Sequence, residues 1–119
     1  MGLTIKSQLQ YERDFCNLMC ELGHHAERVS SSGKRKLSVC DAVLITLLKT
    51  YLVEVKATKE KSFKIKGLHG NVEVANKFNI LPLIAVRFKG NCHKPGRWVW
   101  KIITPNINKI NFEDESDKI

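Results

Sequence analysis

Apolar residues near the start of the chain recur at the spacing of an amphipathic helix. Within residues 4–22 they occupy positions i, i+3, i+4 and i+7, which places them on one helical face. Gly23 follows directly and favours the end of a helix at this point. The predicted face consists of Phe15, Leu18, Met19 and Leu22.

Short runs rich in Val, Ile and Leu predict five strands further along the chain. The segment "TLLKT", residues 46–50, separates the second strand from the third and is short enough for a hairpin. A second helix is expected over residues 68–78, although glycines weaken its first turn. The five strands are expected at residues 24–29, 39–46, 51–58, 81–88 and 97–103.

This order of helix, three strands, helix and two strands predicts an α/β fold in which flanking helices cover a mixed central sheet. The face of the second helix would be formed by Leu68, Val72, Ala75 and Phe78. Residues 59–66 are expected as a basic loop or strand extension. We expect a single domain over residues 1–112, followed by an acidic, flexible tail at residues 113–119.

Composition is that of an ordinary globular domain, with 43% hydrophobic and 27% charged residues in 119. The first ten residues lack the pattern of a secretory signal, and no apolar run approaches the roughly 20 residues that span a bilayer. We therefore expect a cytoplasmic protein. Its four cysteines, which are Cys16, Cys20, Cys40 and Cys92, are then expected as reduced thiols.

Charge narrows the choice of partner. The net charge is +8, and the final seven residues contribute −3, so residues 1–112 carry +11. Such a surface attracts polyanions, with nucleic acid as the first candidate. Binding to a ribosome or to a membrane surface would fit the same number, and charge names no activity.

Three charged residues interrupt the apolar pattern of the predicted hairpin. Glu54 and Lys56 point to the same face of their strand, about 6.6 Å apart, and the partner strand brings Asp41 beside them. Buried carboxylates that converge need a compensating cation, and Mg²⁺ prefers carboxylate oxygens. A neighbouring lysine can orient the attacking water or stabilise charge in the transition state. Ordinary cross-strand pairs on an exposed face are the alternative.

Two other segments could join this group. Glu12 lies at the border of the first helix's apolar face and could point towards the same end of the sheet, or it could be a plain surface glutamate. The segment "SSSGKRK", residues 30–36, combines hydroxyls, a glycine and three cations, a composition suited to holding a phosphate. A solvated loop explains it equally well.

Other candidate chemistry is weaker. Cys16, Cys20 and His24 recur every four residues and could bind zinc with Cys92 and His93, but paired CxxC spacing is absent. Nothing places a histidine beside a cysteine to make it a nucleophile. In the last strand, Trp98 and Trp100 share a face, and we expect them to pack in the core or at a dimer contact rather than against DNA bases.

Taken together and in order, four motifs resemble those of the archaeal Holliday junction resolvases, a branch of the PD-(D/E)XK nuclease superfamily. The motifs are Glu12-Arg13, the loop at residues 30–36, Val39-Cys40-Asp41 and Glu54-Val55-Lys56. The similarity extends from about residue 6 to residue 56 and continues more weakly to residue 88. It differs at Cys40, where a proline is usual, at residues 6–9, where Lys-Gly-Ser is common, and in the missing glutamine of the second helix.

The resemblance implies a homodimer that makes paired nicks in four-way DNA junctions by metal-activated water. Glu12, Asp41 and Glu54 would hold Mg²⁺, with Mn²⁺ as a substitute, Lys56 would be the catalytic lysine, and Ser31 would contribute near the scissile phosphate. A nuclease for other branched or single-stranded DNA, and a non-catalytic DNA-binding module, are the alternatives. The residues expected to bind DNA are Arg13, Ser30, Ser32, Lys34, Arg35, Lys36, Lys59, Lys61, Lys64 and Lys66.

Overall fold

A computed structural model describes residues 7–29, 40–67 and 69–119 of the chain. The first helix, α1 (Gln8–Glu21), begins after Ser7, whose side-chain oxygen accepts a hydrogen bond from the Gln10 amide. It ends as predicted, since Gly23 adopts a positive φ of 92° that other residues rarely adopt. Phe15 and Met19 are fully buried on its inner face.

Five strands form the central sheet in the order β1-β2-β3-β5-β6. Only β3 and β5 run parallel, and the other neighbours are antiparallel, so the sheet is mixed as the sequence predicted. The predicted hairpin is formed by β2 and β3. The strands are β1 (His25–Arg28), β2 (Ala42–Ile45), β3 (Thr50–Thr58), β5 (Leu81–Phe88) and β6 (Arg97–Ile102).

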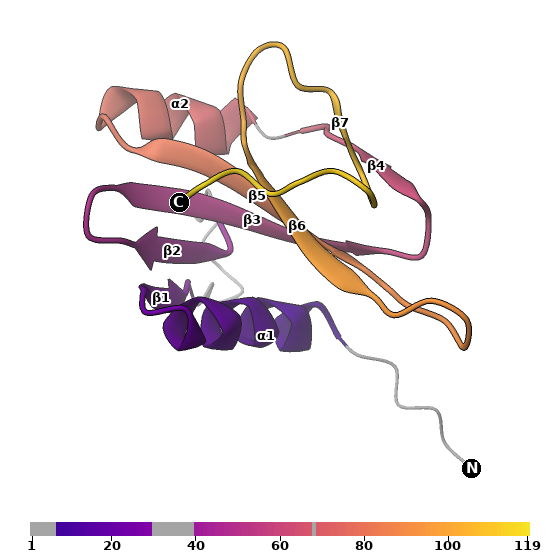
Figure 1. The fold of residues 1–119 in the computed structure, drawn as a ribbon. Helices are drawn as coiled ribbons and strands as arrows, with labels where there is room; N and C mark the ends of the chain where they lie inside the picture. Colours follow the sequence, from indigo (N-terminus) through magenta and orange to yellow (C-terminus); the bar gives the residue numbers. More distant parts are fainter. Residues whose placement is uncertain (1–6, 30–39, 68) are drawn as a thin grey trace.

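Helices cover the two faces of the sheet, with α1 on one side and α2 (His69–Lys77) on the other (Figure 1). Val53 and Val55 point to the α1 side and pack there with Phe15 and Met19. The intervening Leu52 points to the α2 side, where it packs with Ala75. This alternation along β3 places Glu54 and Lys56 on the α2 side of the sheet.

A second, two-stranded sheet was not predicted. It consists of β4 (Ser62–Lys64) and β7 (Lys109–Asn111), which pair antiparallel beside α2. Each strand has three residues, too few for an alternating pattern to be recognised, and residues 59–66, which include β4, were expected as a basic loop or strand extension. The small sheet covers the rest of the central sheet by packing Phe63 and Ile110 against β5 and β6.

The inner face of α2 also differs from the prediction. Phe78, expected in the core, is 62% exposed, because the helix ends at Lys77 and the chain turns away. Asn71 is instead buried, and its Nδ2 donates a 3.5 Å hydrogen bond to the Leu52 carbonyl. None of the helices in the described residues is both long and apolar enough to cross a membrane.

Residues 113–119 lie against β6, the edge strand of the central sheet. Both backbone groups of Trp100 are satisfied there, since its amide donates to Ser116 Oγ and its carbonyl accepts from the Asp117 amide. The Ile102 amide donates to Asp117 Oδ2 over 2.7 Å, and the Trp100 indole donates to the Asp117 carbonyl. The tail thus pairs with the edge of the sheet, a contact that its acidic composition did not predict, and its flexibility stays a prediction.

The two tryptophans of β6 pack inward on the α1 side, the first of the two roles expected for them. Trp98 lies against Phe15 with ring centroids 5.6 Å apart, and Trp100 packs against the same core. Both are half-buried. They therefore serve as fluorescent reporters of the core.

Replacing Asp117 tests whether the tail stabilises the sheet. Asp117→Ala removes the acceptor of the Ile102 amide and the partner of Lys101, whose Nζ lies 3.6 Å away. We expect the free energy of unfolding to fall by about 1 to 2 kcal/mol, measured by urea unfolding with tryptophan fluorescence. Glu115→Ala, at an exposed acid of the same tail, is the control and should leave stability nearly unchanged. Equal effects of both variants would mean that the tail does not hold the edge.

Candidate active site

The site is built around the backbone of Val55 in β3, two residues beyond Val53, the last β3 residue that pairs with β2. Strand β2 begins at Ala42, which pairs with Val53, so among the described residues no strand residue pairs with Val55 on this side of β3. Two side chains take its place. The Val55 amide donates a 2.9 Å hydrogen bond to Asp41 Oδ2, and the Val55 carbonyl accepts a 2.7 Å hydrogen bond from Gln8 Nε2.

Asp41 and Glu54 are brought together by the same pairing. The Asp41 amide donates to the Val53 carbonyl, which continues the register of β2 and places Asp41 opposite Glu54. Burial and then the charge of Asp41 raise the pKa of Glu54 to about 7, and Lys56 opposes the shift. Lys56 Nζ lies 3.7 Å from Glu54 Oε2. Two carboxylates and one ammonium thus share a single patch.

Glu12 lies next to this patch without joining it. Its side chain is buried, with 8% of the residue exposed, and its Oε2 accepts a 3.1 Å hydrogen bond from the same Gln8 amide that binds Val55. Its other oxygen lies 3.5 Å from the Arg28 guanidinium. One residue, Gln8, therefore connects Glu12 to the backbone between Glu54 and Lys56.

The donor set fits a hard divalent cation. Among the residues that the structure describes, no three His, Cys, Asp or Glu side chains lie close enough together to hold a metal ion. The Asp41–Glu54 pair still carries two adjacent carboxylates, one of which is destabilised as an anion, and a cation between them would relieve this.

Five of the residues expected to bind DNA lie in the described part of the chain, and all are exposed: Arg13, Lys59, Lys61, Lys64 and Lys66. Lys59 and Lys61 lie in the bend between β3, the strand that carries Lys56, and β4. The remaining candidates lie outside the described residues; they are Ser30, Ser31, Ser32, Lys34, Arg35 and Lys36.

Sequence reasoning missed Gln8 and Arg28, the two partners of Glu12. A signal for Gln8 existed, because it lies one helical turn before Glu12, at the spacing of neighbours on a helix. Its bond to Val55 crosses 47 residues and has no signature in the sequence. Asn71 was also missed, and its buried Oδ1 has no hydrogen-bond partner among the described residues.

The cysteines do not form a second site. Burial is the main cause that raises the pKa of Cys16 and of Cys40 to about 11, so both thiols stay protonated and unreactive near neutral pH. Cys20 and Cys92 are exposed, and all four cysteines are free, as expected. The described residues hold no cluster of soft ligands, so the zinc alternative has no support.

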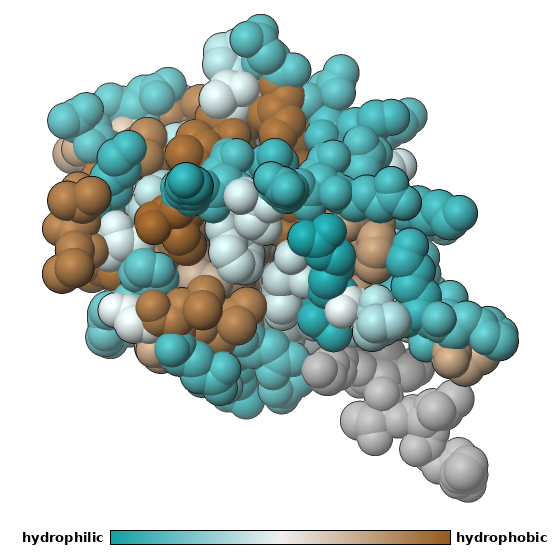
Figure 2. All heavy atoms as spheres, viewed as in Figure 1, coloured by the Kyte–Doolittle hydropathy of each residue, from teal (hydrophilic) through white to brown (hydrophobic). Residues whose placement is uncertain are grey.

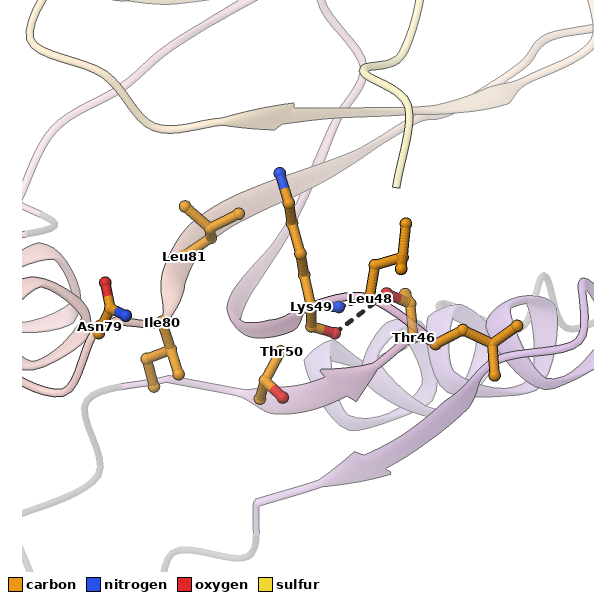
Figure 3. Close-up of a pocket in the computed structure, with 8 residues that line it drawn as sticks. Thr46, Leu48, Lys49, Thr50, Asn79, Ile80 and Leu81 are labelled. Atoms are coloured by element: carbon orange, nitrogen blue, oxygen red, sulfur yellow. Dashed lines mark hydrogen bonds between the residues drawn. The ribbon is translucent and has the colours of Figure 1, made fainter.

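A pocket at the opposite end of β3 carries none of this chemistry. It lies at the β2–β3 turn and is lined by Thr46, Leu47, Leu48, Lys49, Thr50, Asn79, Ile80 and Leu81, without an acid (Figure 3). Thr46 Oγ1 closes the turn by a 3.0 Å hydrogen bond to the Lys49 carbonyl. Leu47 and Leu48 are exposed in this turn. Figure 2 shows apolar atoms at its left edge, where the β2–β3 turn lies in Figure 1.

The strained carboxylate pair predicts a stability change that depends on pH. The folded state keeps a proton on Glu54 up to about pH 7, whereas the unfolded chain loses it near 4.5, so ionisation destabilises the fold as pH rises between these values. In EDTA at pH 8, Glu54→Gln should raise the free energy of unfolding by on the order of 2 kcal/mol. The gain should disappear at pH 4.5.

Urea unfolding at both pH values measures this difference, with Glu60→Gln as the control. Glu60 is an exposed glutamate in the turn after β3, so its replacement should matter little at either pH. If Glu54→Gln instead lowers stability at pH 8, the carboxylate is stabilised in the fold and the assigned repulsion is wrong.

Comparison with known proteins agrees with the fold and with the family that the sequence resembles. The family model "Archaeal holliday junction resolvase (hjc)" matches residues 6–116. A solved structure of Hjc, a Holliday junction resolvase from the archaeal hyperthermophile Archaeoglobus fulgidus, superposes with a TM-score of 0.64 at 22% identity, covering 86% of each chain. No curated protein matches by sequence. Since the family model spans nearly the whole chain, the protein belongs to the archaeal Holliday junction resolvase family.

Proposed function

We propose that this protein resolves four-way DNA junctions as a metal-dependent endonuclease whose reactive centre is Asp41, Glu54 and Lys56. Family membership supports the reaction, because the members are junction-resolving nucleases. The observation that carries the assignment of residues is the patch around Val55, where two carboxylates and an ammonium meet at an open sheet edge. The net charge of +8 suits a DNA substrate.

Each side chain has a distinct part in the proposed mechanism. One oxygen of Asp41 is fixed by the Val55 amide, which holds the carboxylate beside Glu54. Glu54 supplies the second carboxylate. A divalent cation held by this pair supplies Lewis acidity and an activated water. Lys56 keeps its ammonium at the patch, 40% exposed, where it can orient the attacking water or stabilise negative charge developing on the phosphate.

Mg²⁺ is the proposed ion, and Mn²⁺ should substitute for it. Both prefer carboxylate and water oxygens, and Mg²⁺ commonly binds through one or two carboxylates while keeping several waters. The Asp41–Glu54 pair offers that number of ligands. Glu12 is proposed as a third ligand and Ser31 as a contributor near the scissile phosphate, in both cases from the resemblance to the family.

A homodimer is proposed as the active form. Resolution of a junction requires two nicks in strands related by two-fold symmetry, and each chain contributes one Asp41–Glu54 pair. Two copies related by a two-fold axis would place one pair on each strand.

Conservative substitutions separate chemistry from binding. Asp41→Asn retains an oxygen that can accept the Val55 amide, so the sheet edge should survive while a charged ligand is lost. Glu54→Gln acts similarly, and Lys56→Ala removes the ammonium. We expect all three variants to lose cleavage while they bind junction DNA nearly as tightly as the wild-type protein does.

The assay is a gel of a fixed four-way junction labelled on each strand in turn, with Mg²⁺, Mn²⁺ or EDTA. Paired nicks that need both the metal and Asp41 are the expected result, and a large excess of linear duplex should not compete. Strong competition by duplex or by other branched DNA would favour a nuclease of broader substrate range. Tight binding without nicks under any metal would favour a non-catalytic module.

Mixing subunits tests the homodimer. Asp41→Asn protein, mixed in excess with wild-type protein and allowed to exchange, should give mixed dimers with one active site. We expect these dimers to nick a single strand, so that nicked junctions accumulate in place of resolved duplexes. Resolution in proportion to the wild-type fraction alone, with no nicked product, would show that one chain makes both cuts.

A further inference from the structure

The turn between β5 and β6 is a basic projection that the assigned site does not use. Residues 89–97, called here the basic hairpin, extend past the ends of the neighbouring strands (Figure 1). They carry Lys89, Lys94 and Arg97 and no acid. The wider segment, residues 74–112, contains seven lysines and arginines and no aspartate or glutamate.

The basic hairpin lies at the same end of the sheet as the reactive lysine. Thr58 pairs with Phe88, and the Lys89 amide donates a 2.9 Å hydrogen bond to the Thr58 carbonyl, two residues beyond Lys56. Lys89 Nζ also lies 5.4 Å from the ring centre of Tyr11, the neighbour of Glu12 on α1. At about 3.3 Å per residue, the tip of the hairpin is roughly 20 Å from Lys56.

The turn is held in one shape by its own hydrogen bonds. Asn91 Oδ1 accepts from the amides of His93 and Lys94 over 2.8 and 2.9 Å, and the Asn91 amide donates to the Lys94 carbonyl. At the base of the turn its two sides approach so closely that a Cβ on Gly90 would overlap the backbone of Gly96. A rigid turn loses little conformational entropy when it binds.

Two cations of the basic hairpin, Lys94 and Arg97, are oriented by contacts with Phe112. Lys94 Nζ lies 4.0 Å from the ring centre of Phe112, and the Arg97 guanidinium donates to the Phe112 carbonyl. Two acids, Glu113 and Asp114, line the small pocket beside Lys94, and Asp114 already accepts a hydrogen bond from the Asn111 amide. An ammonium over a ring keeps N–H groups free for an anion, and Lys94 and His93 remain exposed at the tip.

We propose that the basic hairpin binds the sugar-phosphate backbone of one duplex arm of the junction, alongside the strand that is cut. Each strand has one phosphate per 3.4 Å of helix axis, so a tip about 20 Å from Lys56 would contact the arm roughly six base pairs along its axis from the scissile bond. The contact is to backbone and carries no sequence preference. The choice of DNA rests on the proposed function.

The experiment measures binding without cleavage, in EDTA, so it does not depend on the nuclease assignment. Lys89→Gln with Lys94→Gln is compared with Lys77→Gln plus Lys118→Gln, two exposed lysines elsewhere, which lowers the net charge by the same two units. Four-way junction affinity is measured from 50 to 200 mM salt. We expect about tenfold weaker binding at 100 mM for the hairpin pair and a salt slope lower by about 1.8. The control pair should change affinity less than twofold.

Equal weakening by the two pairs would show that only bulk charge matters, and no weakening by either would show that the hairpin does not contact DNA. Both results overturn the proposal. Hydroxyl-radical footprinting of the same complexes should show protection of the arm lost about six base pairs from the cut site only for the hairpin pair. A wild-type protein that binds through the hairpin but never cleaves would refute the nuclease assignment alone.

Rigidity is tested separately by Asn91→Ala, which keeps every charge but removes the acceptor of two turn amides. Weaker binding with an unchanged salt slope is expected, because the phosphate contacts are the same and only their ordering cost has risen. Unchanged affinity would overturn the role assigned to the fixed turn.

Discussion

The structure depends on the hydrogen bonds that the backbone of Val55 makes next to the first residue of β2. Among the described residues β3 has no partner strand on its β2 side at this point, and the amide and carbonyl there need other partners, because unsatisfied backbone groups are costly at a buried residue such as Val55. Here the partners are side chains, Asp41 for the amide and Gln8 for the carbonyl. The acid before Val55 and the lysine after it therefore face a carboxylate that the fold itself holds in place.

This arrangement combines two opposing demands. Hydrogen bonding at Val55 requires the Asp41 carboxylate, yet the same carboxylate disfavours the ionised form of its neighbour Glu54. The fold tolerates the repulsion because Leu52, Val53 and Val55 of the same strand are buried against the two helices. Two adjacent carboxylates, one of which is destabilised as an anion, favour the binding of a cation.

Local patterns determine what could be predicted from the sequence. The alternation that put Glu54 and Lys56 on one face and the hairpin that brought Asp41 beside them are short-range, and both hold in the structure. The contacts of Gln8 and Arg28 could not be predicted, because they form only when α1 docks on the sheet. The β4–β7 pair and the tail were missed because three-residue strands and acidic ends resemble loops.

The hydrogen bonds between the tail, residues 113–119, and the edge strand β6 also affect how readily the protein aggregates. A sheet has two edges, and exposed edges invite pairing between molecules and aggregation. One edge here is occupied by the Trp100–Asp117 contacts, and the other is β1, a short strand of four residues that includes Glu27 and Arg28. A basic protein that crowds onto DNA reaches high local concentrations. Its edges are closed or charged, so crowding brings copies together without offering them a shared sheet.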